Sequence, residues 1–354
     1  MESSLIIHLG GPKTGTSALQ AFLAKNRGTL LAKGIDYPAL EDLTSAESGD
    51  ISSGNGVGVA LHFLEPGRHD AKKAYPRFLE MLNQKPQRSI LLSSEYFAYL
   101  REEHFARIRE DASKTGRKLR LILYIRPQIE AIISTYAQRI KRHCETGGLH
   151  DFWIRHQKAF DYLPSIRAFE SAVKRENLTI RVYLRDRFIG GDVVNDFGRL
   201  LGLDFNEDGF SRFALEINPT PNPHELALLR FINTFKRVDY ESGISDSLLA
   251  VTKDSRSPRV DVPRPWLSEG LCSLITEHYR ESNNHLSANY LSHQSFQADT
   301  GRPPVFIAMD QLPEPDPMVK AMAKLYLSMF RAFHRQQHTI NSLLRQQAAS
   351  APEQ

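Results

Sequence analysis

The sequence predicts an α/β fold in which a parallel sheet is flanked by helices and followed by a mostly helical C-terminal half. Short apolar runs alternate with helical patterns through the first half of the 354-residue chain, as in a sheet built from β-α-β units. These runs are nearly continuous in apolar residues, which is typical of strands covered on both faces. From residue 187 onward the pattern is mostly helical. We expect a main domain over 1–300 and an extension over 301–354.

Apolar runs and helical periodicity locate the individual elements. Strands are predicted at 5–9, 89–93, 119–125 and 178–184. Helices are predicted at 17–33, 70–83, 102–114, 127–143, 151–174 with a break at Pro164, 192–201, 224–235 and 265–291. Segment 41–58 is rich in Ser, Gly and Asp and predicts a long binding loop or lid. Segment 218–223 alternates Asn or Thr with Pro and predicts a stiff, extended connector.

Composition and charge narrow the class of protein. The chain has 45 Lys and Arg against 41 Asp and Glu, a net charge of +4 that suits an anionic ligand but gives no argument for nucleic acid. The two cysteines, Cys144 and Cys272, lie far apart with no metal-ligand spacing, so we expect neither a disulfide framework nor a metal site. The first residues lack a basic region and the apolar run 5–9 is short, so we expect no signal peptide, and no stretch reaches 18 apolar residues. These features favour a cytoplasmic protein with no integral membrane segment.

The strongest functional signal is the junction between the first predicted strand and the first predicted helix. Residues 9–17 read Leu-Gly-Gly-Pro-Lys-Thr-Gly-Thr-Ser, and the helix that follows presents free N–H groups and a positive dipole end to the loop. A phosphate fits such a loop, although a capped turn without a ligand is the alternative. The loop is P-loop-like but departs from the Walker A pattern, because that pattern needs lysine where Thr16 stands. The lysine is instead Lys13.

With its lysine at that place, the run from His8 to Ser17 resembles the 5′-phosphosulfate loop of the PAPS-dependent sulfotransferases, especially the bacterial carbohydrate-type members. Segments 19–20, 26–27 and 34–38 extend the resemblance. It implies that 3′-phosphoadenylyl sulfate (PAPS) is the donor and adenosine 3′,5′-bisphosphate the product, with no metal required. It also implies that Lys13 contacts the sulfate–phosphate bridge while the amides after it hold the 5′-phosphate. The implied binding residues of the loop are Gly11, Pro12, Lys13, Thr14, Gly15, Thr16 and Ser17.

A second motif resembles the family's 3′-phosphate site. Arg126 ends the third predicted strand, Pro127 begins a helix, and Ser134 follows on that helix. The apolar stripe of the helix leaves Ser134 off the core face. An arginine fork with a hydroxyl suits a phosphate monoester, whereas a surface arginine and a solvated serine are the alternative.

Two residues are candidates for the general base that sulfuryl transfer to a hydroxyl requires. Glu95 stands at a predicted strand end, in a Ser-Ser-Glu sequence that resembles the same strand end of bacterial relatives. Its alternative is a structural carboxylate that caps a helix or pairs with Arg126. His62 is the rival, because histidine bases are frequent in the wider family. A half-buried structural histidine is the alternative for this residue.

Three functions remain open at this point. The first is a sulfotransferase acting on a hydroxyl or amine of a carbohydrate or glycolipid. The second is a P-loop nucleotide kinase or NTPase, which lacks its lysine at position 16 and a clear Mg²⁺-binding aspartate. The third is a non-catalytic nucleotide-binding assembly protein. The resemblance covers about residues 5–292 and includes no clear glycine-rich segment for the adenine and the far phosphate.

The C-terminal extension contains a long amphipathic helix from 317 to about 346. Apolar residues recur at alternating steps of four and three, which is typical of a helix that buries one stripe. The stripe consists of Met322, Tyr326, Met329, Phe333, the polar Gln336, Ile340 and Leu343. We expect it to be buried, either by docking on the chain's own main domain or in a homodimer.

Overall fold

The computed structural model describes residues 3–11, 13–49, 52–84, 88–207, 209–213, 223–235, 244, 268–292, 296 and 315–349. The chain forms two compact units that interleave along the sequence. The sheet unit comprises 1–132, 156–219 and 272–303, and the helical unit comprises 133–155, 220–271 and 304–354. The predicted domain boundary at residue 300 lies outside the described residues and stays a prediction.

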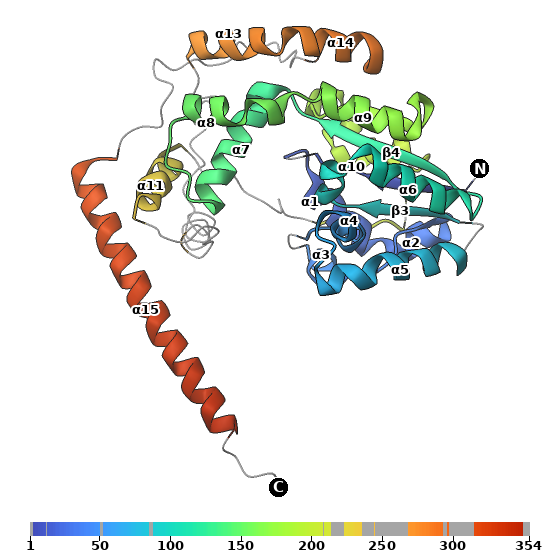
Figure 1. The fold of residues 1–354 in the computed structure, drawn as a ribbon. Coiled ribbons are helices and arrows are strands. Elements are labelled where there is room, and N and C mark those ends of the chain that lie inside the picture. The colour runs from blue at the N-terminus through green and yellow to red at the C-terminus, as the bar shows by residue number, and fades with distance from the viewer. Residues whose placement is uncertain are drawn as a thin grey trace. The chain divides into compact units, whose positions relative to one another are not determined.

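The sheet unit is built on five parallel strands in the order β2-β3-β1-β4-β5 (Figure 1). The strands are β1 (Ser4–His8), β2 (Ile35–Asp36), β3 (Ser89–Ser93), β4 (Lys118–Ile125) and β5 (Leu178–Val182). Strand β1 is central, with Leu5 opposite Ile90 of β3 and Leu119 of β4. The α/β fold with a parallel sheet flanked by helices is therefore confirmed. Strand β2, which has only two residues, was not predicted.

Helices cover both faces of this sheet, which explains why its strands are apolar throughout. On one face, Leu5 and Ile7 pack with helices α4 (Val57–Leu64), α5 (His69–Gln84), α6 (Glu102–Ser113), α9 (Leu163–Val173) and α14 (Arg280–Tyr290). On the other face, Ile6 packs with α1 (Thr16–Lys25), α2 (Arg27–Ala32), α3 (Thr44–Glu47) and α10 (Val193–Leu200). Short 3₁₀ turns join these elements at Glu95–Tyr99 (η1), Gln157–Phe160, Arg175–Asn177, Arg185–Arg187 and Ile189–Gly191.

A buried polar cluster also holds the sheet together on the α10 side. The Tyr124 hydroxyl of β4 donates to Asp196 at 2.8 Å, and Arg181 of β5 forms an ion pair with the same carboxylate. Asp196 is 1% exposed, so both partners are needed to offset the cost of burying its charge. The cluster fixes α10 beneath the ends of β4 and β5.

Two predicted helices are each divided in the structure. The predicted helix 17–33 breaks at Asn26, whose side-chain amide donates to the carbonyls of Phe22 and Ser211 at 2.8 and 2.9 Å. The predicted helix 265–291 is α13 (Glu269–His278) and α14, separated at Tyr279. The Tyr279 hydroxyl donates to the carbonyl of Gln157 at 2.7 Å. In both places a side chain at the break bonds a segment distant in the sequence, a tertiary effect that helical periodicity does not contain.

Two further predictions of local structure need correction. Segment 41–58 is not one long loop, because it contains α3, ends in the first turn of α4 and includes the fully buried Asn55. In segment 151–174 the break lies before Pro164, which stands in the first turn of α9, where proline needs no N–H partner. Helix α8 (Leu149–His156) precedes that break.

The helical unit is described by α11 (Pro223–Asn233), α15 (Pro317–Ala349), most of α8 and the C-terminal part of α7 (Gln128–Arg142). The Asn233 side chain of α11 donates to the carbonyls of Ile140 and Glu145 at 2.8 and 3.1 Å. Helix α15 packs on α11 and extends well beyond it (Figure 1). Most of the predicted connector 218–223 lies outside the described residues. Among the helices that the structure describes, none combines the length and apolarity needed to cross a membrane.

Candidate functional site

The candidate site lies where four strands end at the carboxyl edge of the sheet, the edge at which open α/β sheets bind ligands. The loop 9–15 follows β1, Glu95 follows β3, Arg126 follows β4 and Tyr183 follows β5. Each of these residues belongs to the sheet unit. Three of the four positions were singled out from the sequence, and Tyr183 was not.

Two glycines allow the loop after β1 to fit between neighbouring strand ends. Gly10 has a φ of +53°, and a Cβ there would lie 2.9 Å from the backbone nitrogen of Glu95. At Gly11 a Cβ would lie 2.2 Å from the carbonyl oxygen of Tyr124, a distance that no side chain permits. Glycine is therefore required at both positions, because the loop backbone contacts the ends of β3 and β4 directly.

The start of α1 leaves its first amides without a side-chain cap. Gly15 is the N-cap residue with a φ of +74°, and no side chain bonds the first turn. The hydroxyls of Thr14 and Thr16 donate instead to the carbonyl of Gly11 at 2.6 and 3.4 Å, and Thr16 also lies close enough to Glu95 to lower the pKa of its carboxyl group. Ser17 is half-buried in the same turn. An uncapped helix start preceded by a glycine turn is suited to an anion, which the free amides and the helix dipole both attract.

Lys13 and Arg126 come together at this loop. Lys13 adopts a left-handed backbone conformation with a φ of +61°, which is uncommon outside glycine. Nη1 of Arg126 donates to the Lys13 carbonyl oxygen at 3.2 Å. Burial lowers the pKa of Lys13, and Arg126 lowers it further while Glu95 raises it. Two cations held this close favour an anionic ligand, since an anion relieves their mutual repulsion.

Glu95 has properties that suit a proton acceptor. Desolvation raises the pKa of its carboxyl group, while Lys13 and the hydrogen bond from Thr16 lower it in part. The residue keeps an exposed face, so solvent and ligands reach a carboxylate that protein atoms otherwise surround. A carboxylate with a raised pKa is a better base at neutral pH than an ordinary glutamate.

Pairing with Arg126 and capping of η1 are both carried out by residues other than Glu95. Arg126 pairs with Glu130, whose Oε2 lies 3.1 Å from its Nε, and not with Glu95. The turn η1 is capped by Ser94, whose hydroxyl oxygen accepts from the amide of Tyr96 at 3.3 Å. The carboxylate of Glu95 is left to interact with Lys13 and Thr16.

Arg126 is held on several sides. In addition to Glu130 and the Lys13 carbonyl, its guanidinium lies over the Tyr183 ring, 5.7 Å from the centroid. Its own carbonyl accepts from the Tyr162 hydroxyl at 2.9 Å. Tyr183 also lies against the loop, because a Cβ on Gly15 would come within 3.1 Å of its ring. The sequence signal for Tyr183 was its place at the end of the fourth predicted strand.

The remaining predicted site residues are placed as follows. His62 lies on α4, stacked parallel on Tyr75 with 4.7 Å between ring centroids and edge-on to Phe63 at 5.1 Å. Within the described residues, no contact joins His62 to Lys13, Glu95 or Arg126. Ser134 is half-buried on α7 in the helical unit, whereas Arg126 belongs to the sheet unit, so their pairing stays a prediction. Pro12 lies outside the described residues.

Sequence reasoning missed a buried polar network directly below the loop. Nδ1 of His8 lies 2.9 Å from the hydroxyl of Ser93, which also accepts from the Gln20 amide at 3.2 Å. The Ser93 backbone N–H donates to the side-chain oxygen of Asn55 at 2.8 Å. Burial lowers the pKa of His8 to about 3, so its ring is neutral at physiological pH. The sequence signal for this network was a polar residue at the end of each of two apolar strands, His8 and Ser93.

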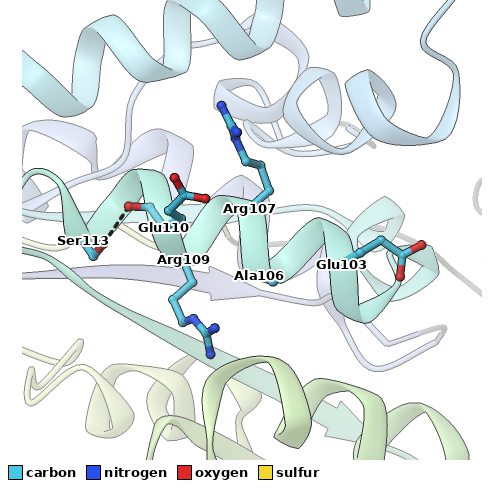
Figure 2. Close-up of a pocket in the computed structure, with 6 residues that line it drawn as sticks. All are labelled: Glu103, Ala106, Arg107, Arg109, Glu110 and Ser113. Carbon is cyan, nitrogen blue, oxygen red and sulfur yellow. Dashed lines mark hydrogen bonds between the residues drawn. The ribbon is translucent and has the colours of Figure 1, made fainter.

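A hollow of about 630 Å³ on the surface of α6 is a separate feature (Figure 2). It is lined by Glu103, Ala106, Arg107, Arg109, Glu110 and Ser113. Its polar groups are engaged within the protein: Arg109 donates to the carbonyl of Ala172, and Ser113 donates to that of Glu110 at 2.7 Å. No converging unsatisfied groups were found there among the described residues, so the loop site remains the candidate.

Comparisons with known proteins give distant likenesses. No family model matches the chain. An uncharacterized protein from Archaeoglobus fulgidus is 25% identical over 201 residues, which are 57% of this chain. The match spans about half, 53%, of the length of that relative.

Two solved structures were also found. A sulfotransferase from Alicyclobacillus acidocaldarius matches with a TM-score of 0.38 and 14% identity, over 66% of this chain and 93% of that chain. A sulfotransferase domain from the curacin biosynthetic pathway matches with a TM-score of 0.33 and 13% identity, over 78% of this chain and 98% of that chain.

Proposed function

We propose that the protein is a PAPS-dependent sulfotransferase that transfers a sulfuryl group to a hydroxyl or amine of a carbohydrate or glycolipid. The observation that carries the proposal is the convergence of Lys13, Glu95 and Arg126 on the loop after β1. An anion-binding helix start, two cations and a carboxylate with a raised pKa are the groups that such a transfer uses.

We infer that two groups of residues hold the donor, one at each of its charged ends. The loop from Gly11 to Ser17 would hold the 5′-phosphosulfate, because its amides lack a side-chain cap and Lys13 adds a positive charge. Arg126 would hold the 3′-phosphate together with Ser134. When bound, PAPS supplies the activated sulfuryl group. No nucleic acid or metal ion is needed for this chemistry.

Two side chains then have distinct roles in the transfer. Glu95 accepts the proton of the acceptor hydroxyl, which its raised pKa favours. The Lys13 ammonium stabilises the negative charge that develops on the bridging oxygen as the S–O bond breaks. His62 remains the rival base until the two residues are compared, although its ring packs in an aromatic cluster.

The turn after Glu95 supports a carbohydrate acceptor. Tyr96 and Tyr99 stand three residues apart on η1, where 3₁₀ geometry places them on the same side. They are 38% and 70% exposed. Exposed aromatic rings beside the base offer an apolar face with a polar tip, the surface that stacks on a sugar ring.

The competing functions fit the site less well. In a nucleotide kinase or NTPase the residue at position 16 is a lysine that reaches the phosphates, whereas the Thr16 hydroxyl here bonds Glu95. A non-catalytic nucleotide-binding protein has no use for a carboxylate with a raised pKa beside Lys13.

The decisive experiment measures transfer of ³⁵S-sulfate from labelled PAPS to a panel of glycans and glycolipids, with EDTA present throughout. We expect incorporation that adenosine 3′,5′-bisphosphate inhibits and that ATP with Mg²⁺ does not. Phosphate transfer from labelled ATP, with no transfer from PAPS, would assign the kinase function instead. Tight binding of the bisphosphate with no transfer to any acceptor would favour the assembly protein.

A further inference from the structure

Helix α15 presents two different faces. One face packs on α11: Leu327 is 4% exposed, Lys320 lies 5.6 Å from the centre of the Phe231 ring, and Arg331 donates to the carbonyl of Phe235 at 2.7 Å. The other face carries large apolar side chains in contact with solvent. Within the described residues this stripe is not covered by the chain itself, and burial in a homodimer stays a prediction.

We call the exposed stripe the seam, and it begins with Val319, Met322, Tyr326 and Met329. These side chains are 40%, 65%, 41% and 63% exposed. Their spacing of three, four and three continues in the sequence through Phe333, Gln336, Ile340 and Leu343. From 319 to 343 the seam runs about 37 Å at 1.5 Å per residue, over more than three heptads. Monomeric proteins rarely expose an apolar strip of this extent.

We propose that the seam pairs with the seam of a second copy of this chain, forming a two-helix coiled coil that makes the protein a dimer. The proposal is independent of the function proposed above. Its first support is the heptad spacing, which repeats apolar residues at the two positions that face a partner helix in a coiled coil. A symmetric pair buries the same strip on both copies at once.

The distribution of charge is the second support. The positions beside the seam choose the partner in a coiled coil, and like charges there prevent self-association. Here these positions are all uncharged: Ala323, Leu325, Phe330, Ala332, Gln337, Thr339, Leu344 and Gln346. The helix has five basic residues and no Asp or Glu, and helical periodicity places all five on the side away from the seam: Lys320, Lys324, Arg331, Arg335 and Arg345. Two copies can thus approach without repulsion.

Other occupants of the seam fit less well. A helix that lies on an anionic membrane turns its basic face to the lipid headgroups and solvent, whereas Lys320 and Arg331 here contact α11. The sheet unit offers no matching stripe in its described residues. Its exposed large apolar side chains are scattered over separate elements, namely Leu31, Tyr96, Tyr99, Ile189 and Leu274.

Gln336 allows a specific test of the proposed interface. A single polar residue in an otherwise apolar seam lowers the stability of a coiled coil while fixing its register. Replacing it with an apolar residue of similar length should strengthen self-association and should do nothing in a monomer. Gln336→Leu should therefore stabilise the dimer, whereas a disruptive substitution in the seam destabilises it.

The test is the mass of the full chain, measured by light scattering and sedimentation over a range of concentrations. We expect the wild-type protein to be a dimer and Met322→Glu/Met329→Glu to be a monomer. Ala321→Glu/Ser328→Glu is the matched control, because it adds the same charge at exposed positions of the same helix outside the seam. The control should stay dimeric. Gln336→Leu should lower the dissociation constant roughly tenfold, an effect of about 1.4 kcal/mol.

Several outcomes would overturn the proposal. A monomeric wild-type chain at every concentration excludes the dimer, and so does a Met322→Glu/Met329→Glu variant that remains dimeric. Circular dichroism verifies that this variant keeps its helix content, and if it does not, the shift caused by Gln336→Leu decides alone. Cosedimentation of a monomeric wild type with vesicles containing phosphatidylserine, abolished by the same double substitution, would assign the seam to a membrane instead.

Discussion

The Lys13 carbonyl oxygen accepts a hydrogen bond from Nη1 of Arg126 at 3.2 Å, so the loop after β1 and the end of β4 are directly joined. The guanidinium is held in place by this bond, by Glu130 and by the Tyr183 ring before any ligand arrives. A prearranged guanidinium loses little conformational entropy when it binds a phosphate. The two motifs found in the sequence are therefore adjacent in the structure.

The first prediction concerns the 3′-phosphate. Adenosine 3′,5′-bisphosphate should bind about ten- to a hundredfold better than adenosine 5′-monophosphate, because a charge-assisted contact contributes about 1.5–3 kcal/mol. Arg126→Gln should abolish this preference, as titration calorimetry will show. Equal binding of both nucleotides to the wild type contradicts the assignment.

The second prediction concerns Lys13. Lys13→Ala should lower kcat more than it weakens binding of the bisphosphate, because the ammonium acts on charge that develops in the transition state. Thr14→Ala serves as a control that removes a hydroxyl bonded within the loop. A Lys13→Ala enzyme with unchanged turnover would show that the lysine serves binding only.

A third prediction separates the two candidate bases. Glu95→Gln should leave nucleotide affinity intact and lower turnover by about 10²–10⁴, while His62→Ala should retain most of it. Because the pKa of Glu95 is raised, wild-type activity should fall with decreasing pH at a value above the ordinary range of a glutamate. The opposite ranking of the two variants would identify His62 as the base.

The acceptor is tested at η1. Tyr99→Ala should raise the KM for a glycan acceptor and leave the KM for PAPS unchanged, because the 70% exposed ring stands on the turn that begins at Glu95. Tyr99→Phe keeps the ring and should behave as the wild type. If Tyr99→Ala leaves both constants unaltered, the acceptor lies elsewhere.

The fifth prediction is an acid sensitivity of folding. The folded state depresses the pKa of His8 from 6.5 to about 3, so the unfolded chain gains a proton first as pH falls. Stability is thus retained above pH 6.5 and decreases below it by about 1.4 kcal/mol per pH unit. Urea unfolding between pH 7 and 5, before most carboxylates titrate, should show this slope. His8→Gln should flatten it while keeping a bond to Ser93.

The sheet was predictable because its strands are buried on both faces. The predicted runs at 89–93 and 119–125 agree with β3 and β4 to within a residue, since continuous apolar sequence records double-sided burial. Strand β2 escaped detection because two residues carry no periodicity. The break at Asn26 escaped because its cause is a bond to Ser211, 185 residues away.

The site was predictable to the extent that its residues follow strands in a recognisable spacing. Lys13, Glu95 and Arg126 each stand beside a glycine loop or a strand end, and the structure brings them together. Tyr183, Glu130 and the His8 network were not identified, because their importance depends on packing partners on other strands. Ser134 and His62 stay predictions.

The side chain of Asn55 bonds the carbonyls of Pro38 and Leu91 and the amide of Ser93, and the amide of Gly56 bonds the Ser93 carbonyl. These bonds attach the C-terminal end of segment 38–56 to strand β3, at Ser93, two residues before Glu95. Changes in the outer part of this segment are therefore not transmitted to Glu95, because the bonds of Asn55 fix the end of the segment to the sheet. The exposed positions of 42–49 can therefore be varied without moving Glu95, provided that Leu43 and Ala46 keep their places in the core.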